Sequence, residues 1–248
     1  MLRFFRILRK KLLEEDNIRK YFWYALGEIL LVMIGILLAL QVNNWNSERQ
    51  LSESAEINLE LLAKDLTEDR ESLLALIEIY ENDLDNALLT LNMIKGVIDV
   101  SDRVSEYLVG FQLEYNFYPR NSALNVLLNS GEISVLDVEL QNMISQYYRA
   151  VDAVKERDEI SNIFIRDKYE LHIFEEYSSL YSKENTFPVI GEFYQDDTRD
   201  ILIFDTEKFL ADKKLEALLF ARYYQIKTLI NVYNSALESL SDLQKSIE

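Results

Sequence analysis

The side chains of this chain that are best suited to chemistry are few, and they do not form a catalytic set. The sequence has one histidine, His172, and no cysteine. A nucleophilic triad needs a His or Lys base beside an activated Ser or Cys, and phosphate-binding turns need Gly-rich runs, which do not occur here. We therefore predict no catalytic residue, no cofactor and no enzymatic activity, and we expect His172 to be a structural or surface residue.

One acid-rich run has the composition of a cation-binding loop. It contains Asp196, Asp197 and Asp200, with Arg199 among them and Asp205 beyond. Calcium prefers oxygen ligands, but the EF-hand loop also requires a central Gly and a terminal Glu, which this run lacks. An ordinary polar turn is the favoured interpretation, and we predict no metal site.

Glu28 is an acid inside an otherwise apolar segment, residues 21–42. Acids at membrane depth are rare, costly and usually face protein. At about 100° per residue, Glu28 shares a helix face with Gly35 and Ala39, whose small side chains allow close approach of another helix. We expect these three residues to mediate association of membrane helices. The alternative is that Glu28 only extends its carboxylate toward the inner membrane interface.

Arg222 is a charged residue on the apolar face of a helix predicted over about 211–247. A polar residue in such a position can fix the register of a bundle by pairing with a partner across it. Asp69 and Asp83, on the first helix of the bundle, are the candidate partners. The alternative is an Arg whose aliphatic stem packs while its guanidinium reaches water.

Residues 21–42 form the predicted membrane segment. They contain one acid and no base among 22 residues, and Trp45 follows them. About 20 apolar residues span a hydrocarbon core of about 30 Å, and aromatic residues favour both interfaces. The segment exceeds the apolar region of a cleaved signal peptide, and no A-x-A-like cleavage site follows it. We predict an uncleaved transmembrane helix.

Charge predicts the orientation of this helix. Residues 1–20 hold seven bases and three acids, whereas the chain beyond residue 42 holds 19 bases and 39 acids. The positive-inside rule places residues 1–20, a basic amphipathic segment, in the cytoplasm against the inner leaflet. Residues 43–248 then lie on the far side of the membrane, and their negative charge excludes nucleic acid as a partner.

Several motifs resemble one family of membrane proteins. They are YALGEI at 24–29, IGILLALQVNNWN at 34–46, ALNVLLNSG at 123–131 and QYY at 146–148. This pattern is similar to an uncharacterised family of single-pass proteins of Bacteroidota-type Gram-negative bacteria. The resemblance is dense over residues 18–50 and weak beyond about residue 150. It implies an inner-membrane protein with a periplasmic domain, and it implies no activity.

The distribution of Gly and Pro predicts an all-α fold. With 6 Gly and 2 Pro, three long stretches contain neither residue, which favours helices. Heptad-spaced apolar residues predict helices over about 47–98, 134–181 and 211–247. Because each has an apolar face, we expect an elongated, coiled-coil-like antiparallel bundle of three helices, continuous with the transmembrane helix. The clearest heptad series are Leu66, Leu73, Tyr80, Ala87 and Ile94, then Leu219, Ile226, Tyr233, Leu240 and Ile247, and beside them Leu215, Arg222, Leu229, Ala236 and Leu243.

Two long connections are expected to close opposite ends of this bundle. Residues 99–131 are predicted to cap the end distal to the membrane, and residues 183–210 to lie near the membrane. The first connection is rich in aromatic residues that either plug the bundle, the favoured interpretation, or contact a partner; they are Phe111, Tyr115, Phe117 and Tyr118.

These features predict an interaction protein. We expect a membrane-anchored periplasmic scaffold, a subunit of a homo-oligomer or of a larger envelope complex. The alternative is a ligand-binding sensor or accessory subunit that signals through a partner membrane protein. A single crossing with about 20 cytoplasmic residues argues against signalling without a partner.

Overall fold

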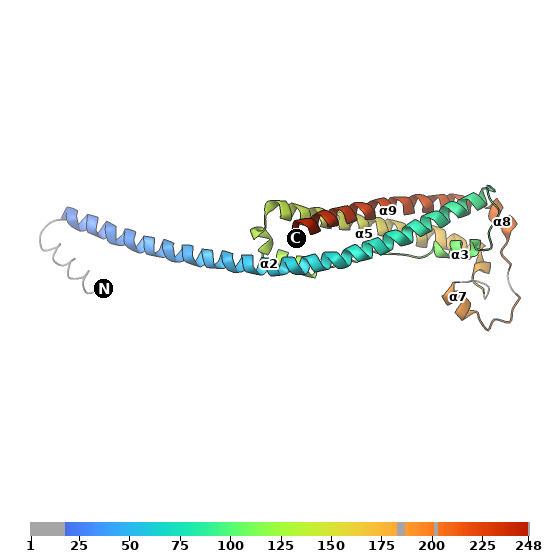
Figure 1. The fold of residues 1–248 in the computed structure, drawn as a ribbon, viewed down its shortest axis with the longest axis horizontal. Coiled ribbons are helices and arrows are strands. Elements are labelled where there is room, and N and C mark those ends of the chain that lie inside the picture. Colours follow the sequence, from blue (N-terminus) through green and yellow to red (C-terminus); the bar gives the residue numbers. More distant parts are fainter. Residues whose placement is uncertain (1–17, 183–186, 201–202, 248) are drawn as a thin grey trace. The chain divides into compact units, whose positions relative to one another are not determined.

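The computed structural model describes residues 18–182, 187–200 and 203–247, and these contain helices and loops but no strand. The predicted all-α helical bundle is confirmed at that level. The chain divides into two compact units, residues 1–57 and residues 58–248. One helix, α2 (Ile18–Ile94), contributes to both units (Figure 1).

The first unit consists, in its described part, of the beginning of α2. Its apolar window has a mean hydropathy of 2.4, and none of it is buried. This helix is long and apolar enough to cross a membrane. Most of the basic segment on which the predicted orientation depends, residues 1–17, lies outside the described residues.

The second unit is built on three long helices: α2 from Asn58 onward, α5 (Val138–Phe164) and α9 (Lys213–Ile247). Burial of one apolar face holds each helix in place. Both predicted series of α9 are buried as far as Leu243, and only Ile247 at its end is partly exposed. The predicted series of α2 from Leu66 to Ile94 is buried throughout. The helix ends at Ile94, and Gly96 supplies the positive φ of 69° that turns the chain away.

The directions of the three helices differ from the expected alternation. The contacts that fix them are Thr67 with Gln244, Tyr80 with Tyr233, Asp69 with Tyr147, and Asp158 with Tyr233. As residue numbers rise along α2 from Thr67 to Tyr80, the residue numbers of their partners on α9 fall from 244 to 233. Along α5 they rise, from Tyr147 beside Asp69 to Asp158, which shares its partner Tyr233 with Tyr80. Helix α9 is therefore antiparallel to α2, as predicted, whereas α5 runs parallel to it.

A crossover segment, residues 111–121, makes this parallel arrangement possible. It follows α3 (Val104–Gly110) and leads to α4 (Ser122–Asn129) and η1 (Glu132–Val135). Its backbone lies along the bundle, because Phe117 N–H reaches Asp158 and Arg120 N–H reaches Asp69. Residues 99–131 therefore do not form a cap at one end, and that expectation is wrong. An extended segment, and not a helix, carries the chain back along the bundle.

The second long connection lies at the end of the bundle where α2 terminates. After α5 the chain continues through a π-helix, η2 (Ile165–Glu170), into α6 (Leu171–Glu176). Three separate short helices follow: η3 (Ser178–Leu180), α7 (Pro188–Phe193) and α8 (Thr206–Ala211). The Tyr181 hydroxyl donates to Gln112 at 2.6 Å. Phe187 lines a cavity with Asp83 and Tyr107. The beginning of the first connection and the second connection thus meet at one end, contrary to the prediction that the two connections close opposite ends.

Candidate functional site

The core of the second unit contains a group of buried polar side chains. Asp158 and Arg222 are each only 1 % exposed, although charged residues are almost never fully buried without partners. Such groups mark either a site or a structural device, and their hydrogen bonds decide between the two. The remaining buried polar residues of the three long helices are Asn58, Asp69, Thr90, Ser161 and Asn162.

Asp158 binds the crossover segment. Its carboxylate accepts the Phe117 backbone N–H at 3.0 Å and the Tyr233 hydroxyl at 2.9 Å. Burial raises the pKa of Asp158 to about 6, although these hydrogen bonds lower it. Two helices and the crossover segment are therefore joined at this one carboxylate.

Asp69 performs the same role three residues further along the crossover segment. It accepts the Arg120 backbone N–H at 2.8 Å and the Tyr147 hydroxyl at 2.8 Å. Burial raises its pKa, and the two hydrogen bonds oppose that shift. Asn162 adds a bond from its amide to the Tyr115 carbonyl at 3.2 Å. These groups satisfy backbone that would otherwise be buried unpaired, which makes them structural.

Arg222 lies on the buried face of α9, as the heptad predicts. Its guanidinium donates to Ser161 Oγ at 2.7 Å, and its Nε has no hydrogen-bond partner among the described residues. Burial lowers its pKa, and the charge of Asp83 opposes this most strongly. Burial also disfavours the charged form of Asp83, and it raises the pKa of that carboxyl to about 6. Of the two predicted partners, Asp83 acts on Arg222 through its charge, whereas Asp69 binds Tyr147 and the crossover segment instead.

The four aromatic contact candidates separate into core and surface. Phe111 and Phe117 are 1 % and 2 % exposed, so they cannot contact a partner. Tyr115 packs edge-on against Tyr80 with ring centroids 5.8 Å apart. Tyr118 is 78 % exposed and is the one of the four that remains available for contact.

Glu28, Gly35 and Ala39 lie on α2 in the first unit. Gly35 and Ala39 are exposed and Glu28 is partly exposed. A Cβ added at Gly35 would meet no atom within 4 Å. This surface is open to a neighbouring helix, and its role in association stays a prediction.

His172 has a structural setting. It is buried, and its Nε2 lies 2.7 Å from Asp212 Oδ2, which also accepts the Tyr177 hydroxyl at 2.9 Å. Asp212 caps α9 by accepting the Leu215 N–H at 2.9 Å. Burial raises the pKa of Asp212, but these hydrogen bonds outweigh it and the net pKa is lowered. The cluster joins α6 to the start of α9.

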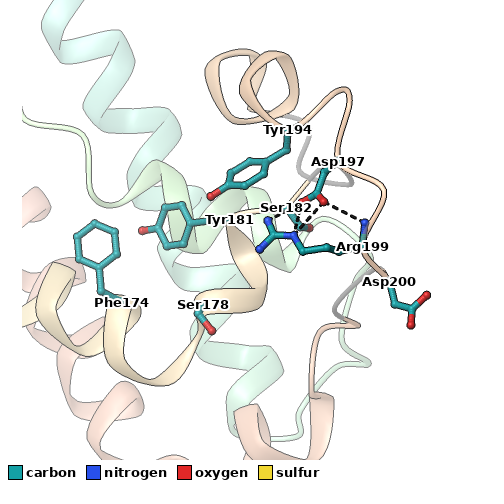
Figure 2. A pocket seen from close by; sticks show the side chains of 8 residues that line it. All are labelled: Phe174, Ser178, Tyr181, Ser182, Tyr194, Asp197, Arg199 and Asp200. Carbon is teal, nitrogen blue, oxygen red and sulfur yellow. Dashed lines mark hydrogen bonds and ion pairs between the residues drawn. The ribbon is translucent and has the colours of Figure 1, made fainter.

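The acid-rich run forms a polar turn. Asp197 binds the Arg199 guanidinium, with Oδ2 to Nη2 at 2.6 Å, and Asp205 caps α8 through the Lys208 N–H at 2.9 Å. In the part of the chain that the structure describes, no group of three or more His, Cys, Asp or Glu side chains is placed to hold a metal ion. The turn instead borders a cavity of about 480 Å³ (Figure 2).

Sequence reasoning missed Asp158, Asn162 and this cavity. The positions of Tyr147, Val151, Val154 and Asp158 follow the helical three-and-four spacing of a buried face, so a signal for Asp158 was present. The surrounding charges of residues 155–159 obscured it. In comparisons with protein-family models, with curated proteins and with solved structures, nothing matches this chain.

Proposed function

We propose that this chain is a membrane-anchored helical interaction protein of the bacterial envelope, a subunit of a homo-oligomer or of a larger membrane complex, without enzymatic activity. The observation that carries the proposal is the contrast along α2. Its apolar window from residue 22 is fully unburied, whereas residues 58–248 form a compact unit with its own core. A free apolar helix attached to a folded domain is the pattern of a membrane anchor.

The orientation in this proposal is cytoplasmic for the N-terminus and periplasmic for residues 43–248, in the inner membrane. The excess of bases in residues 1–20 and the 39 acids beyond residue 42 support it. The resemblance to single-pass inner-membrane proteins points the same way.

Association in this proposal is mediated by the face that carries Glu28, Gly35 and Ala39. A carboxyl in lipid is stabilised when a neighbouring helix supplies a hydrogen-bond partner, and small residues let that helix approach. The exposure of Gly35 and Ala39 leaves room for such a neighbour.

A ligand-binding accessory subunit is the second candidate function. The cavity beside Arg199 favours it, because about 480 Å³ lies within the range of small-molecule sites. With one candidate membrane helix among the residues that the structure describes, such a subunit would pass its signal to a partner membrane protein.

Thiol accessibility tests the anchor and its orientation. The chain has no cysteine, so Ser130→Cys and Leu2→Cys each give a single thiol. In intact spheroplasts an impermeant maleimide should label the cysteine at exposed position 130 and not the one at position 2. Labelling of both after lysis is the control.

Reversed labelling would contradict the orientation, and release of the protein into the soluble fraction would contradict the anchor. Native mass measurement in mild detergent then separates the two functions. An interaction subunit should appear as a defined oligomer or complex, and a persistent monomer without partner would contradict that proposal.

A further inference from the structure

The cavity of about 480 Å³ is walled by three aromatic side chains from three segments. Phe174 comes from α6, Tyr181 follows η3, and Tyr194 follows α7 (Figure 2). The Phe174 and Tyr181 rings stack with centroids 5.1 Å apart and planes 29° from parallel. Tyr181 is fixed by its hydrogen bond to Gln112, whereas Tyr194 packs edge-on against its exposed chain neighbour Phe193 at 4.9 Å. The stacked pair of Phe174 and Tyr181 is therefore the preorganised part of the aromatic wall.

Polar groups form the rim of this cavity. They are Ser178 and Ser182 together with Asp197, Arg199 and Asp200, and Ser182 is drawn beside the Asp197–Arg199 pair (Figure 2). Arg199 Nε lies 2.9 Å from Asp197 Oδ1, and Nη2 lies 2.6 Å from Oδ2. This two-point pairing holds the guanidinium plane in one orientation. The Arg199 side chain is still 76 % exposed, so it can reach a bound molecule.

The charges at the rim restrict the chemical class of the ligand. Asp197 neutralises Arg199, so this pair offers donors and acceptors without net charge. An anion would be repelled by Asp200 and by a domain with 39 acids against 19 bases. The same field would attract an organic cation, so the binding test includes choline as a competing ligand. A neutral ligand that carries many hydroxyl groups fits the paired donors and acceptors of the rim.

The aromatic walls restrict it further. Ring faces are apolar and carry negative partial charge, so they favour a flat surface of C–H groups. A pyranose sugar presents C–H groups on one face and hydroxyl groups around its edge. Serine hydroxyls donate and accept, and a guanidinium donates to hydroxyl oxygens in its plane.

We propose that this cavity is a saccharide-binding site that takes a neutral pyranose unit. Tyr194 and Phe174 contact the C–H face of the sugar. Arg199 donates hydrogen bonds to its hydroxyl oxygens, with Asp197 as the positioning residue, and Ser178 and Ser182 bind the remaining hydroxyls. The site stands independently of the membrane orientation proposed above. If that orientation holds, the ligand is a glycan of the periplasm.

Binding is tested on the full chain in a detergent without a sugar headgroup, because a glycosidic headgroup would compete. The probes are the tetrasaccharides of N-acetylglucosamine and of α-1,4-linked glucose. Saturation-transfer NMR should show the sugar C–H protons receiving magnetisation, and calorimetry should give a saturable Kd for at least one probe. Tyr194→Ala should weaken that Kd about five- to tenfold, and Arg199→Ala should weaken it similarly.

Tyr118→Ala is the matched control, because Tyr118 is an exposed tyrosine outside the cavity, and it should leave the Kd unchanged. Arg199→Lys keeps the charge but loses the planar fork, so it should not restore binding. Circular dichroism of each variant confirms that it is folded.

Three results would overturn the site. They are no saturable binding of either probe up to about 10 mM, a Kd that survives both Tyr194→Ala and Arg199→Ala in folded protein, or tighter binding of choline than of either saccharide.

Discussion

The Asp158 carboxylate accepts the backbone N–H of Phe117, 41 residues earlier in the chain, at 3.0 Å. The same carboxylate accepts the Tyr233 hydroxyl, so it joins α5, α9 and the crossover segment. A helix in place of the crossover segment would satisfy its own backbone. This extended segment cannot, and the bundle supplies carboxylates where its N–H groups are buried.

Removal of this carboxylate should destabilise the bundle. Asp158→Ala leaves the Phe117 N–H and the Tyr233 hydroxyl without their acceptor, at a cost of about 2–4 kcal/mol in the free energy of unfolding. Urea denaturation of fragment 47–248 measures it. Asp152→Ala, an exposed aspartate of the same helix, should cost less than about 0.5 kcal/mol. Equal effects of the two substitutions would refute a structural role for Asp158.

The stability of the domain should depend on pH through two acids. Burial raises the pKa of both Asp83 and Asp158 to about 6, above the value of about 3.9 in an unfolded chain. Between these values the folded state binds more protons than the unfolded state, so these two groups make stability rise as pH falls from about 7 to about 5.

Urea midpoints of fragment 47–248 at several pH values measure this slope. The double variant Asp83→Asn with Asp158→Asn should flatten it, because the titrating groups are gone. An unchanged slope in the folded double variant would show that other groups cause the pH dependence.

Arg222 and Asp83 should be coupled. Arg222→Met keeps most of the buried volume but leaves the partly buried Asp83 without the cation that lowers its pKa. We expect loss of stability at about pH 7, with a further rise in the pKa of Asp83. Adding Asp83→Asn should recover most of the loss, which a double-mutant cycle measures as a coupling of about 1–3 kcal/mol. Additive effects would exclude an electrostatic link between the two residues.

Glu28 should support association of the membrane helix. Glu28→Gln should preserve it, because the amide still donates and accepts, whereas Glu28→Leu and Gly35→Leu should weaken it through lost bonds of about 0.6–2 kcal/mol each. Crosslinking and native mass in lipid measure the oligomer. Gly27→Leu is the matched control, because Gly27 lies about 100° around the helix from Glu28. If Glu28→Leu associates as well as the parent chain, Glu28 has no part in association.

Periodicity predicted α9 almost residue by residue, because its buried positions from Leu215 to Leu243 are apolar apart from Arg222. Periodicity fails in the second half of α5 and its continuation. The apolar residues Ile160, Leu171 and Phe174 keep a helical spacing but are about half exposed, and Asp158, Ser161 and Asn162 occupy the buried face instead. Those polar residues are buried because they bind other segments, and that requirement cannot be read from the local sequence.

Local sequence patterns did not predict the path of the crossover segment either. Its direction depends on hydrogen bonds such as that from Arg120 N–H to Asp69, which join residues 51 positions apart. The cavity depends on three aromatic residues that approach one another only after α6 and α7 are in place. Both features arise from tertiary structure, so helix periodicity predicts neither.

The place of α9 in the chain also constrains the order of folding. This helix of 35 residues follows the other two long helices, and it supplies Tyr233, whose ring packs on Tyr80 and whose hydroxyl binds Asp158. While the ribosome is still synthesising α9, the first two helices have no third surface on which to bury their apolar faces. The domain therefore completes its core only after α9 has been synthesised, and a chain interrupted before residue 233 exposes that core to aggregation and proteolysis.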